Sequence, residues 1–546
     1  MSNSPTGRRT AAFWPLVAVA FLAFVVLVQR FDAPVVLVGS LAVPVVLTLL
    51  LRPTLAIPAT LFLLYVNVPA ILTQQHRIPP LAAGAIVLLL AFPLIHALVV
   101  RREPLRLDTT LFLMLGYLAV LVATALGATG HRVATQHIQK FLVEGILLYG
   151  LLINVIRTRE TLNRAIWTVL AAGMLLGALT TYQELTGSFS LEFGGLSRRN
   201  HEYLTLQHLD REDPGVRERL QAYARNNPNG ARSSRANGPM DEPNRFAQIL
   251  IVLLPLALFA YRTRRDRWTG LLVAAASGSI VLGMVFSHSR GAFATLMGLA
   301  LIAVALRWVR RSYLVGGVLA AVLFAPLMAP QYVERITSIA TASALFDDTS
   351  TENADGAILG RATSMLAAAQ VFMDHPLKGV GPGQFKPYYS EEYRQKNPDL
   401  KFRDVQGPRS SHSLYFEIAA EGGVLGLTSF FAIFGFLIHG LNRERRRWAQ
   451  SRPELAGLAT AFLFSLLAYL GTGLFLHLSF QRYLWILVGL AGAALHILCT
   501  SEDDEGLPAV ANSRAVSRRI PASGVWNGWT DQRDRKFSTP PEHTTP

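Results

Sequence analysis

His412 is the residue of this sequence that is best placed to do chemistry. It ends a long polar segment and stands two residues before an apolar run of membrane length. A neutral imidazole can act as a base near pH 7, and a base held at a membrane surface can meet a substrate arriving from either phase. This position favours an enzyme over a pore. A lone histidine at a helix start is nevertheless more often a packing residue than a catalyst, so its neighbours must decide.

Arginines at the ends of other apolar runs could bind an anion. Arg235 precedes a helix start at Pro243-Asn244, and Arg290 stands beside Ser289 in a turn between two apolar runs. A guanidinium can fork onto phosphate oxygens. A cation at membrane depth is costly unless it is functional or reaches the lipid headgroups. Asn244 by itself predicts no more than a helix cap.

A glycine-rich loop adds a further candidate for anion binding. Residues 379–385 read Gly-Val-Gly-Pro-Gly-Gln-Phe and follow an amphipathic segment that opens at Arg361. Such a loop can point backbone N–H groups at an anion. It lacks a Walker lysine pattern, and glycine-proline clusters more often mark turns. The loop alone is therefore weak support for a site.

The composition places these residues in an integral membrane protein. The chain has 546 residues, of which 51% are hydrophobic and only 16% charged, and its mean hydropathy is +0.33. A spanning helix needs about 20 mostly apolar residues, and about fourteen runs meet this length, or twelve to thirteen if the division at Arg52-Pro53 is wrong. The runs cover 11–28, 34–51, 54–72, 79–100, 108–127, 138–156, 162–184, 245–261, 268–287, 291–308, 313–330, 414–439, 455–476 and 480–499.

Arginines in alternate connections predict the orientation. Short loops such as 101–102, 262–267 and 443–447 are rich in arginine, whereas the loops between them, such as 29–33, are poor in cations. Cations stay on the cytoplasmic side, so both termini are expected there. Topology also explains most of the net charge of +15, so we expect membrane lipids and no nucleic acid as partners. The single cysteine, Cys499, excludes a disulfide framework.

The spans and loops divide the chain into six parts. Two long connections fall on the outer side, and loops of this length are usually functional or disordered. The predicted parts are N-terminal transmembrane helices (1–186), a periplasmic loop (187–244), central transmembrane helices (245–330), a large periplasmic cap (331–411), C-terminal transmembrane helices (412–499) and a disordered cytoplasmic tail (500–546).

Together these segments resemble the bacterial O-antigen ligase and O-antigen polymerase superfamily. The shared features are an arginine before a Pro-Asn-x-Phe-Ala helix start, a Ser-Arg-Gly turn, a Gly-x-Gly-Pro-Gly-x-Phe loop and a His-(Asn/Ser/Gln)-x9-Gly pattern. They occur in this order over about 110–490. Each motif is weak alone, and the ordered set carries the resemblance. The sequence departs from the commoner pattern at Ser413, where Asn is more frequent.

The resemblance implies both a fold and a reaction. The fold is an all-α integral membrane protein, a polytopic bundle of about 12–14 transmembrane helices with a partly helical periplasmic cap, similar to the GT-C class. The reaction is glycan transfer from undecaprenyl pyrophosphate to an acceptor hydroxyl at the periplasmic face of the bacterial inner membrane. It is inverting, needs no metal ion and uses no cofactor. An O-antigen ligase with a glycolipid acceptor is preferred. A polymerase acting on a growing glycan and a protein O-oligosaccharyltransferase remain open.

This chemistry gives the candidate residues their expected roles. His412 takes the proton of the attacking hydroxyl, while Arg235 and Arg290 stabilise the pyrophosphate leaving group. Nearby arginines are expected to lower the pKa of His412 and keep it neutral. The residues expected to bind the pyrophosphate or glycan are Arg361, Asn244, Ser289, Gly381 and Gly383.

Two other functions compete with this interpretation. Acidic clusters at 210–213 and 347–348 could bind a divalent ion through oxygen ligands, although solvated acidic loops are common. The number of spans also suits a transporter or lipid flippase. Coupled transport commonly places ionisable groups near the membrane midplane, and Glu144 and Glu184 are the main candidates for that role.

Overall fold

The structure is a computed structural model, and it describes most of the predicted spans. The described residues are 55–74, 84–189, 191–199, 235–240, 242–263, 266–306, 308, 356–396, 409–477 and 482–501. The predicted spans 11–28, 34–51 and 313–330, both acidic clusters and nearly all of the predicted tail lie outside these ranges.

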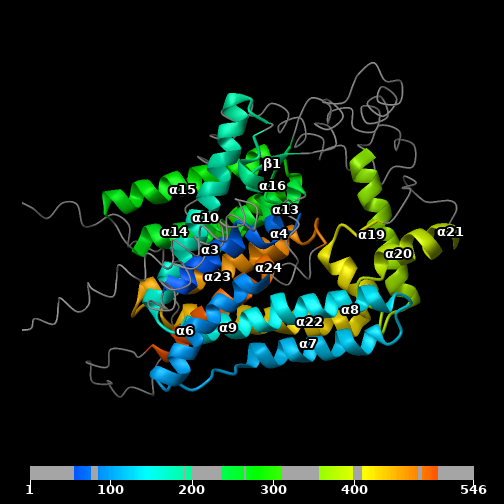
Figure 1. The fold of residues 1–546 in the computed structure, drawn as a ribbon, viewed down its shortest axis with the longest axis horizontal. Helices are drawn as coiled ribbons and strands as arrows, with labels where there is room; N and C mark the ends of the chain where they lie inside the picture. Colours follow the sequence, from blue (N-terminus) through cyan, green and yellow to red (C-terminus); the bar gives the residue numbers. More distant parts are fainter. Residues whose placement is uncertain are drawn as a thin grey trace, which may run out of the picture.

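Helices dominate the described part of the chain (Figure 1). Seven are long and apolar enough to cross a membrane, and the bent pair α3 and α4 forms an eighth candidate span. This confirms the predicted all-α polytopic membrane protein. The N-terminal half contains α3 (Ala56–Tyr65), α4 (Val68–Gln74), α6 (Ala91–Ile95), α7 (Thr109–Ala125), α8 (His131–Lys140), α9 (Leu148–Val155) and α10 (Arg159–Thr186).

The rest of the chain contributes the remaining helices and the two strands of a small ribbon. The helices are α13 (Pro243–Ile251), α14 (Leu254–Thr263), α15 (Arg267–Phe286), α16 (Arg290–Ala305), α19 (Gly356–Asp374), α20 (Phe385–Tyr388), α21 (Arg394–Lys396), α22 (Leu414–Arg447), α23 (Pro453–Thr472) and α24 (Arg482–Thr500). The ribbon pairs β1 (Arg198–Arg199) antiparallel with β2 (Ala236–Gly238).

Small residues let α10 and α15 approach closely. A Cβ added at Gly177 would lie 2.1 Å from the backbone oxygen of Ser279, and one at Gly283 would lie 3.0 Å from the Cα of Gly177. Close backbone approach through small residues is a usual way for helices to associate in lipid, where apolar burial gives no net driving force. This contact fixes the turn that follows α15, which carries His288 and Ser289.

The described helices of the second long connection lie at one end of the bundle. They are α19, α20 and α21, at the right of Figure 1. The Gly130 N–H donates to the Gln384 side chain at 2.8 Å, which ties the cap to the connection between α7 and α8. The Leu414 N–H donates to the Gly473 carbonyl at 2.8 Å. This bond joins the first residue of α22 to the residue that follows α23. Hydrogen bonds between distant parts of the chain therefore hold together the end of the bundle that carries His412.

Candidate active site

Arg235 joins two of the predicted motifs. Its Nε donates to the Ser287 carbonyl at 2.9 Å, and one terminal nitrogen donates to the Asn244 side-chain oxygen at 3.0 Å and to the His288 carbonyl at 3.4 Å. His288 has a φ of 52°, a left-handed conformation that is uncommon for a residue other than glycine. The turn before α16 and the start of α13 are thus held together by one guanidinium.

The hydrogen bonds continue from Asn244 toward a second histidine. The Asn244 amide donates to Glu242 at 2.9 Å, and Glu242 forms an ion pair with Arg245 at 3.2 Å. Arg245 in turn lies 3.3 Å from Nε2 of His477. Burial raises the pKa of Glu242, but Arg245, the bond from Asn244 and the charge of Arg361 hold it below its ordinary value. Glu242 is therefore ionised and can orient Arg245.

His412 lies directly against His477. Their ring centroids are 5.4 Å apart, and the ring planes are nearly perpendicular at 87°. His412 has a φ of 55°, and its buried Nδ1 has no hydrogen-bond partner among the described residues. Residues in sparsely populated backbone conformations cluster at functional sites. His412 thus combines an unusual backbone with an open ring nitrogen.

Burial and neighbouring charge keep the His412 ring neutral. Burial, followed by the positive charge of Arg361, lowers the pKa of His412 to about 4. The lowered pKa and the contribution of an arginine agree with the expectation from the sequence. Burial, which is the larger cause, was not part of that expectation. A ring that is neutral near pH 7 can accept a proton.

A narrow pocket brings together three of the predicted substrate-binding residues. It is a tight crevice between α13, α16, α19 and the end of α23, and in this conformation it leaves no room for a water molecule. Arginine and neutral polar groups line one part of it, and the apolar segment before His477 lines another. The lining residues are Asn244, Ser289, Gly291, Ala292, Arg361, Thr472, Phe475 and Leu476.

Arg290 begins α16 at the edge of this pocket. Ser289 caps the helix by accepting from the Ala292 N–H at 3.4 Å, and Gly291 packs so closely that an added Cβ would lie 3.0 Å from Phe475. Phe475 lines the pocket as well, so the Ser-Arg-Gly turn forms part of its wall. The structure therefore places Arg235, Arg290, Arg361 and His412 in one region.

The glycine-rich loop has a different role from the one expected. The Gly383 N–H donates to one oxygen of Glu421 at 2.8 Å, and the Phe385 N–H donates to the other at 3.2 Å. The Gly381 N–H donates to the Glu421 backbone carbonyl at 2.9 Å. These amides already have acceptors within the protein. They are not available to a phosphate, because each N–H has one proton to donate.

Positive backbone angles explain the glycines of this loop. Gly379, Gly381 and Gly383 have φ values of 64°, 100° and 72°, and Gly423 in α22 has a φ of 61°. The Val424 N–H, just after this break in α22, donates to the Pro376 carbonyl at 2.8 Å. The loop is thus docked on a broken helix, and glycine is the residue that tolerates these angles.

Sequence reasoning missed Glu242, Arg245 and His477. His477 lies beside a predicted span and carries no motif of its own, but its ring lies against that of His412. A signal was present, since His477 ends an apolar run at the same end of the bundle as His412. Nothing in the sequence alone pairs residues that are 65 positions apart. Only the contact between the segments before α22 and after α23 does so.

The acidic residues considered for transport are paired with arginines. Glu144 accepts from Arg482 at 2.8 Å, and Glu184 accepts from Arg199 at 2.6 Å. Arg199 lies in the β-ribbon, and Arg482 begins α24. Both pairs lie near the end of the bundle that carries the candidate site. Neither supplies the lone midplane carboxylate expected for coupled transport.

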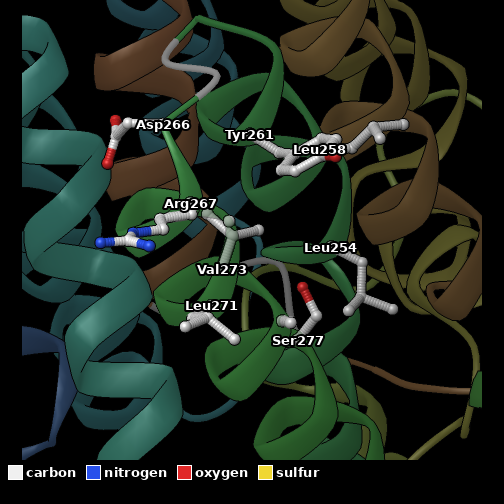
Figure 2. A pocket seen from close by; sticks show the side chains of 10 residues that line it. Leu254, Leu258, Tyr261, Asp266, Arg267, Leu271, Val273 and Ser277 are labelled. Carbon is white, nitrogen blue, oxygen red and sulfur yellow. The ribbon is translucent and has the colours of Figure 1, made fainter.

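A larger groove lies away from these residues. Figure 2 shows it between α14 and α15, with Tyr261, Asp266 and Arg267 among its labelled side chains. It follows the connection between the two helices, whereas the candidate site lies at their other ends. Its lining is mostly apolar and leucine-rich. The groove carries none of the groups that the site brings together.

Comparison with known families identifies the central part of this region. Residues 275–431 match the family model described as O-antigen ligase. This segment, which makes up less than half of the chain, is similar to the O-antigen ligase family. The match confirms the predicted resemblance to the O-antigen ligase and polymerase superfamily. No curated protein sequence matches the chain.

The O-antigen ligase segment contains only part of the site. It includes the turn with Arg290, the cap residue Arg361, the glycine-rich loop and His412. Arg235, Asn244 and His477 lie outside it and reach the site through the fold. The family supports a glycosyltransferase of the O-antigen ligase and polymerase type, with glycan and lipid-linked substrates, in a multi-pass membrane protein.

Proposed function

We propose that this protein is an O-antigen ligase that transfers a glycan from undecaprenyl pyrophosphate to a hydroxyl of a glycolipid acceptor. The reaction takes place at the periplasmic face of the bacterial inner membrane, with both termini in the cytoplasm. The observation that carries the proposal is the buried His412, whose Nδ1 has no partner among the described residues, together with the crevice that Arg361 shares with Asn244 and Ser289. A base thus stands next to groups suited to a phosphate.

The proposed reaction is a direct displacement at the anomeric carbon. The acceptor oxygen forms a bond to this carbon while the bond to the pyrophosphate oxygen breaks. His412 takes the proton of the acceptor hydroxyl, and the electron pair of the broken bond leaves with the pyrophosphate. Attack from the side opposite the leaving group inverts the anomeric centre. His412 then releases its proton to water.

Arginines stabilise the charge that develops on the leaving group. Arg361 lines the pocket from α19, Arg290 lies between the lining residues Ser289 and Gly291, and Arg235 bonds to the turn before α16. Preorganised positive charge lowers the energy of a transition state in which negative charge accumulates. We propose that these guanidinium groups perform this task without a metal ion. Arg235 acts at least partly by positioning, because it bonds to Asn244 and to two backbone carbonyls.

Purified protein provides the first test. The protein is incubated in detergent with a polyprenyl-pyrophosphate glycan and a glycolipid acceptor. Detergent has no separate compartments, so the assay detects transfer and not transport. We expect glycosylated acceptor and free polyprenyl pyrophosphate in equal amounts. Absence of turnover across varied donors and acceptors would contradict transfer and favour a transporter.

Deletion of the gene separates a ligase from a polymerase. A missing ligase should leave long lipid-linked polymer that is not transferred to the glycolipid. A missing polymerase should leave single repeat units on the lipid carrier. Accumulation of single repeat units would therefore contradict the ligase assignment while keeping the glycosyltransferase.

A further inference from the structure

His477 is held in one tautomer by its neighbour. Arg245 approaches Nε2 of His477 at 3.3 Å, and a guanidinium has donors but no acceptor. Nε2 must therefore be the acceptor in this contact. A neutral imidazole has one donor and one acceptor nitrogen, so the proton is on Nδ1.

The approach of Arg245 is itself fixed by the rest of the site. Glu242 binds Arg245 at 3.2 Å, and Asn244 donates to the other oxygen of Glu242 at 2.9 Å. Asn244 accepts from Arg235. An unbroken series of contacts thus runs from the turn before α16 to His477, and each member limits the orientation of the next.

The Nδ1–H of His477 is a buried donor that lacks an acceptor among the described residues. His477 is 8% exposed, and its Nδ1 has no hydrogen-bond partner among the described residues. A buried donor without an acceptor is costly, and in native structures such a group calls for an explanation. The ring lies against His412, and Leu476 beside it lines the pocket. A substrate that enters this crevice past Leu476 would supply an acceptor for Nδ1.

We propose that His477 binds the substrate by donating a hydrogen bond from Nδ1 to one of its oxygens, next to the oxygen handled by His412. The inference rests on the proposed function for the identity of the substrate. The two histidines then have complementary tasks, since His412 accepts a proton and His477 only donates a hydrogen bond. The oxygen belongs either to the acceptor sugar or to the pyrophosphate, and kinetics can separate these two sources.

Two substitutions divide the functions of the ring. His477→Asn places an amide donor near the position of Nδ1 and gives up the contact with Arg245. His477→Gln places an amide oxygen near the position of Nε2, which keeps an acceptor for Arg245 and gives up the donor. His477→Ala removes both groups. The matched control is His439→Gln, because His439 is exposed on α22.

The full-length variants are assayed in detergent for transfer, with thermal unfolding as a check on folding. We expect His477→Gln and His477→Ala to lose roughly tenfold to a hundredfold in kcat/KM, the loss of one hydrogen bond to a polar or charged oxygen. His477→Asn should retain most of the activity, and the control should equal the wild type. A higher KM for the acceptor assigns the bond to a sugar hydroxyl, whereas a higher KM for the donor assigns it to the pyrophosphate.

Retention of activity by His477→Gln with loss in His477→Asn overturns the inference, because a packing residue that only satisfies Arg245 behaves in this way. Equal activity in all variants overturns it too. If the wild type transfers nothing, the proposed function fails. Binding then decides, measured as the shift in unfolding temperature caused by polyprenyl pyrophosphate or by the acceptor glycolipid. A smaller shift in His477→Gln than in the wild type supports the donor role, and equal shifts overturn it.

Discussion

The glycine-rich loop and the arginine-lined pocket both contain groups suited to anions, yet they use them differently. In the loop at 379–385, the N–H groups of Gly381 and Gly383 donate to Glu421. Arg361 lines the pocket, and its positive charge acts on His412, whose buried Nδ1 has no partner among the described residues. The N–H groups of this loop therefore do not indicate anion binding, whereas the site at His412 retains a ring nitrogen with no partner among the described residues. The loop at 379–385 binds to α22, and we assign the reaction to the region of the pocket and His412.

Replacement of His412 tests the pocket most severely. We expect His412→Ala to lower the transfer rate by about 10²–10⁴-fold, the usual contribution of a general base. Folding should change little, because the ring has no hydrogen bond to lose among the described residues. Transfer assays and thermal unfolding measure the two effects. The control is His375→Ala, since His375 is exposed at the end of α19. Near-normal turnover of the His412 variant would end its assignment as the base.

Arg290→Lys keeps the charge of the pocket and removes the fork. We expect transfer to fall by about tenfold to a hundredfold, because an ammonium does not reproduce two parallel hydrogen bonds to a phosphate. The loss should be in kcat rather than in the unfolding temperature. Arg267→Lys serves as the control, since Arg267 lies at the opposite end of the helix that precedes this turn. Equal activity of Arg290→Lys and wild type would reduce Arg290 to a source of charge.

Glu421→Ala tests the loop. The substitution leaves the N–H groups of Gly383 and Phe385 without their acceptor, and each buried, unpaired group costs about 1–3 kcal/mol. We expect a lower unfolding temperature and a smaller loss of transfer than for His412→Ala. Glu421→Gln should recover part of the stability, because its amide oxygen still accepts one bond. A variant with normal stability and no transfer would show that Glu421 takes part in the reaction and is not only structural.

The pH dependence of transfer gives the smallest and most specific effect. With the pKa of His412 lowered to about 4, the ring stays neutral and transfer stays level from neutral pH down to weakly acidic pH. It falls as the pH approaches this pKa, because the protonated ring cannot accept a proton. Arg361→Gln removes a charge that opposes protonation, so the fall should move to higher pH. A profile that Arg361→Gln leaves unmoved would show that the two groups are not coupled.

The sequence predicted the type of fold and most members of the site. Apolar runs of membrane length identified the spans, and all eleven that fall at least partly in the described ranges contain apolar helix. Arg290 and His412 were found because each borders such a run, whereas Arg235 and Arg361 were found from the motifs that follow them in the long connections. A charged or titratable residue at that position is costly, and it therefore stands out from the composition around it.

What the sequence could not predict was how the donors and acceptors are paired. Two pairings depend on contacts between residues that are far apart in the chain. The Gly383 N–H donates to Glu421, and Arg245 contacts Nε2 of His477. The sequence by itself determined a polytopic helical membrane protein with a base and arginines at the ends of its spans, because membrane thickness and charge act on each segment separately. Only the tertiary structure decided which polar groups satisfy one another and which remain open to a substrate, because a hydrogen bond requires positions that only packing defines.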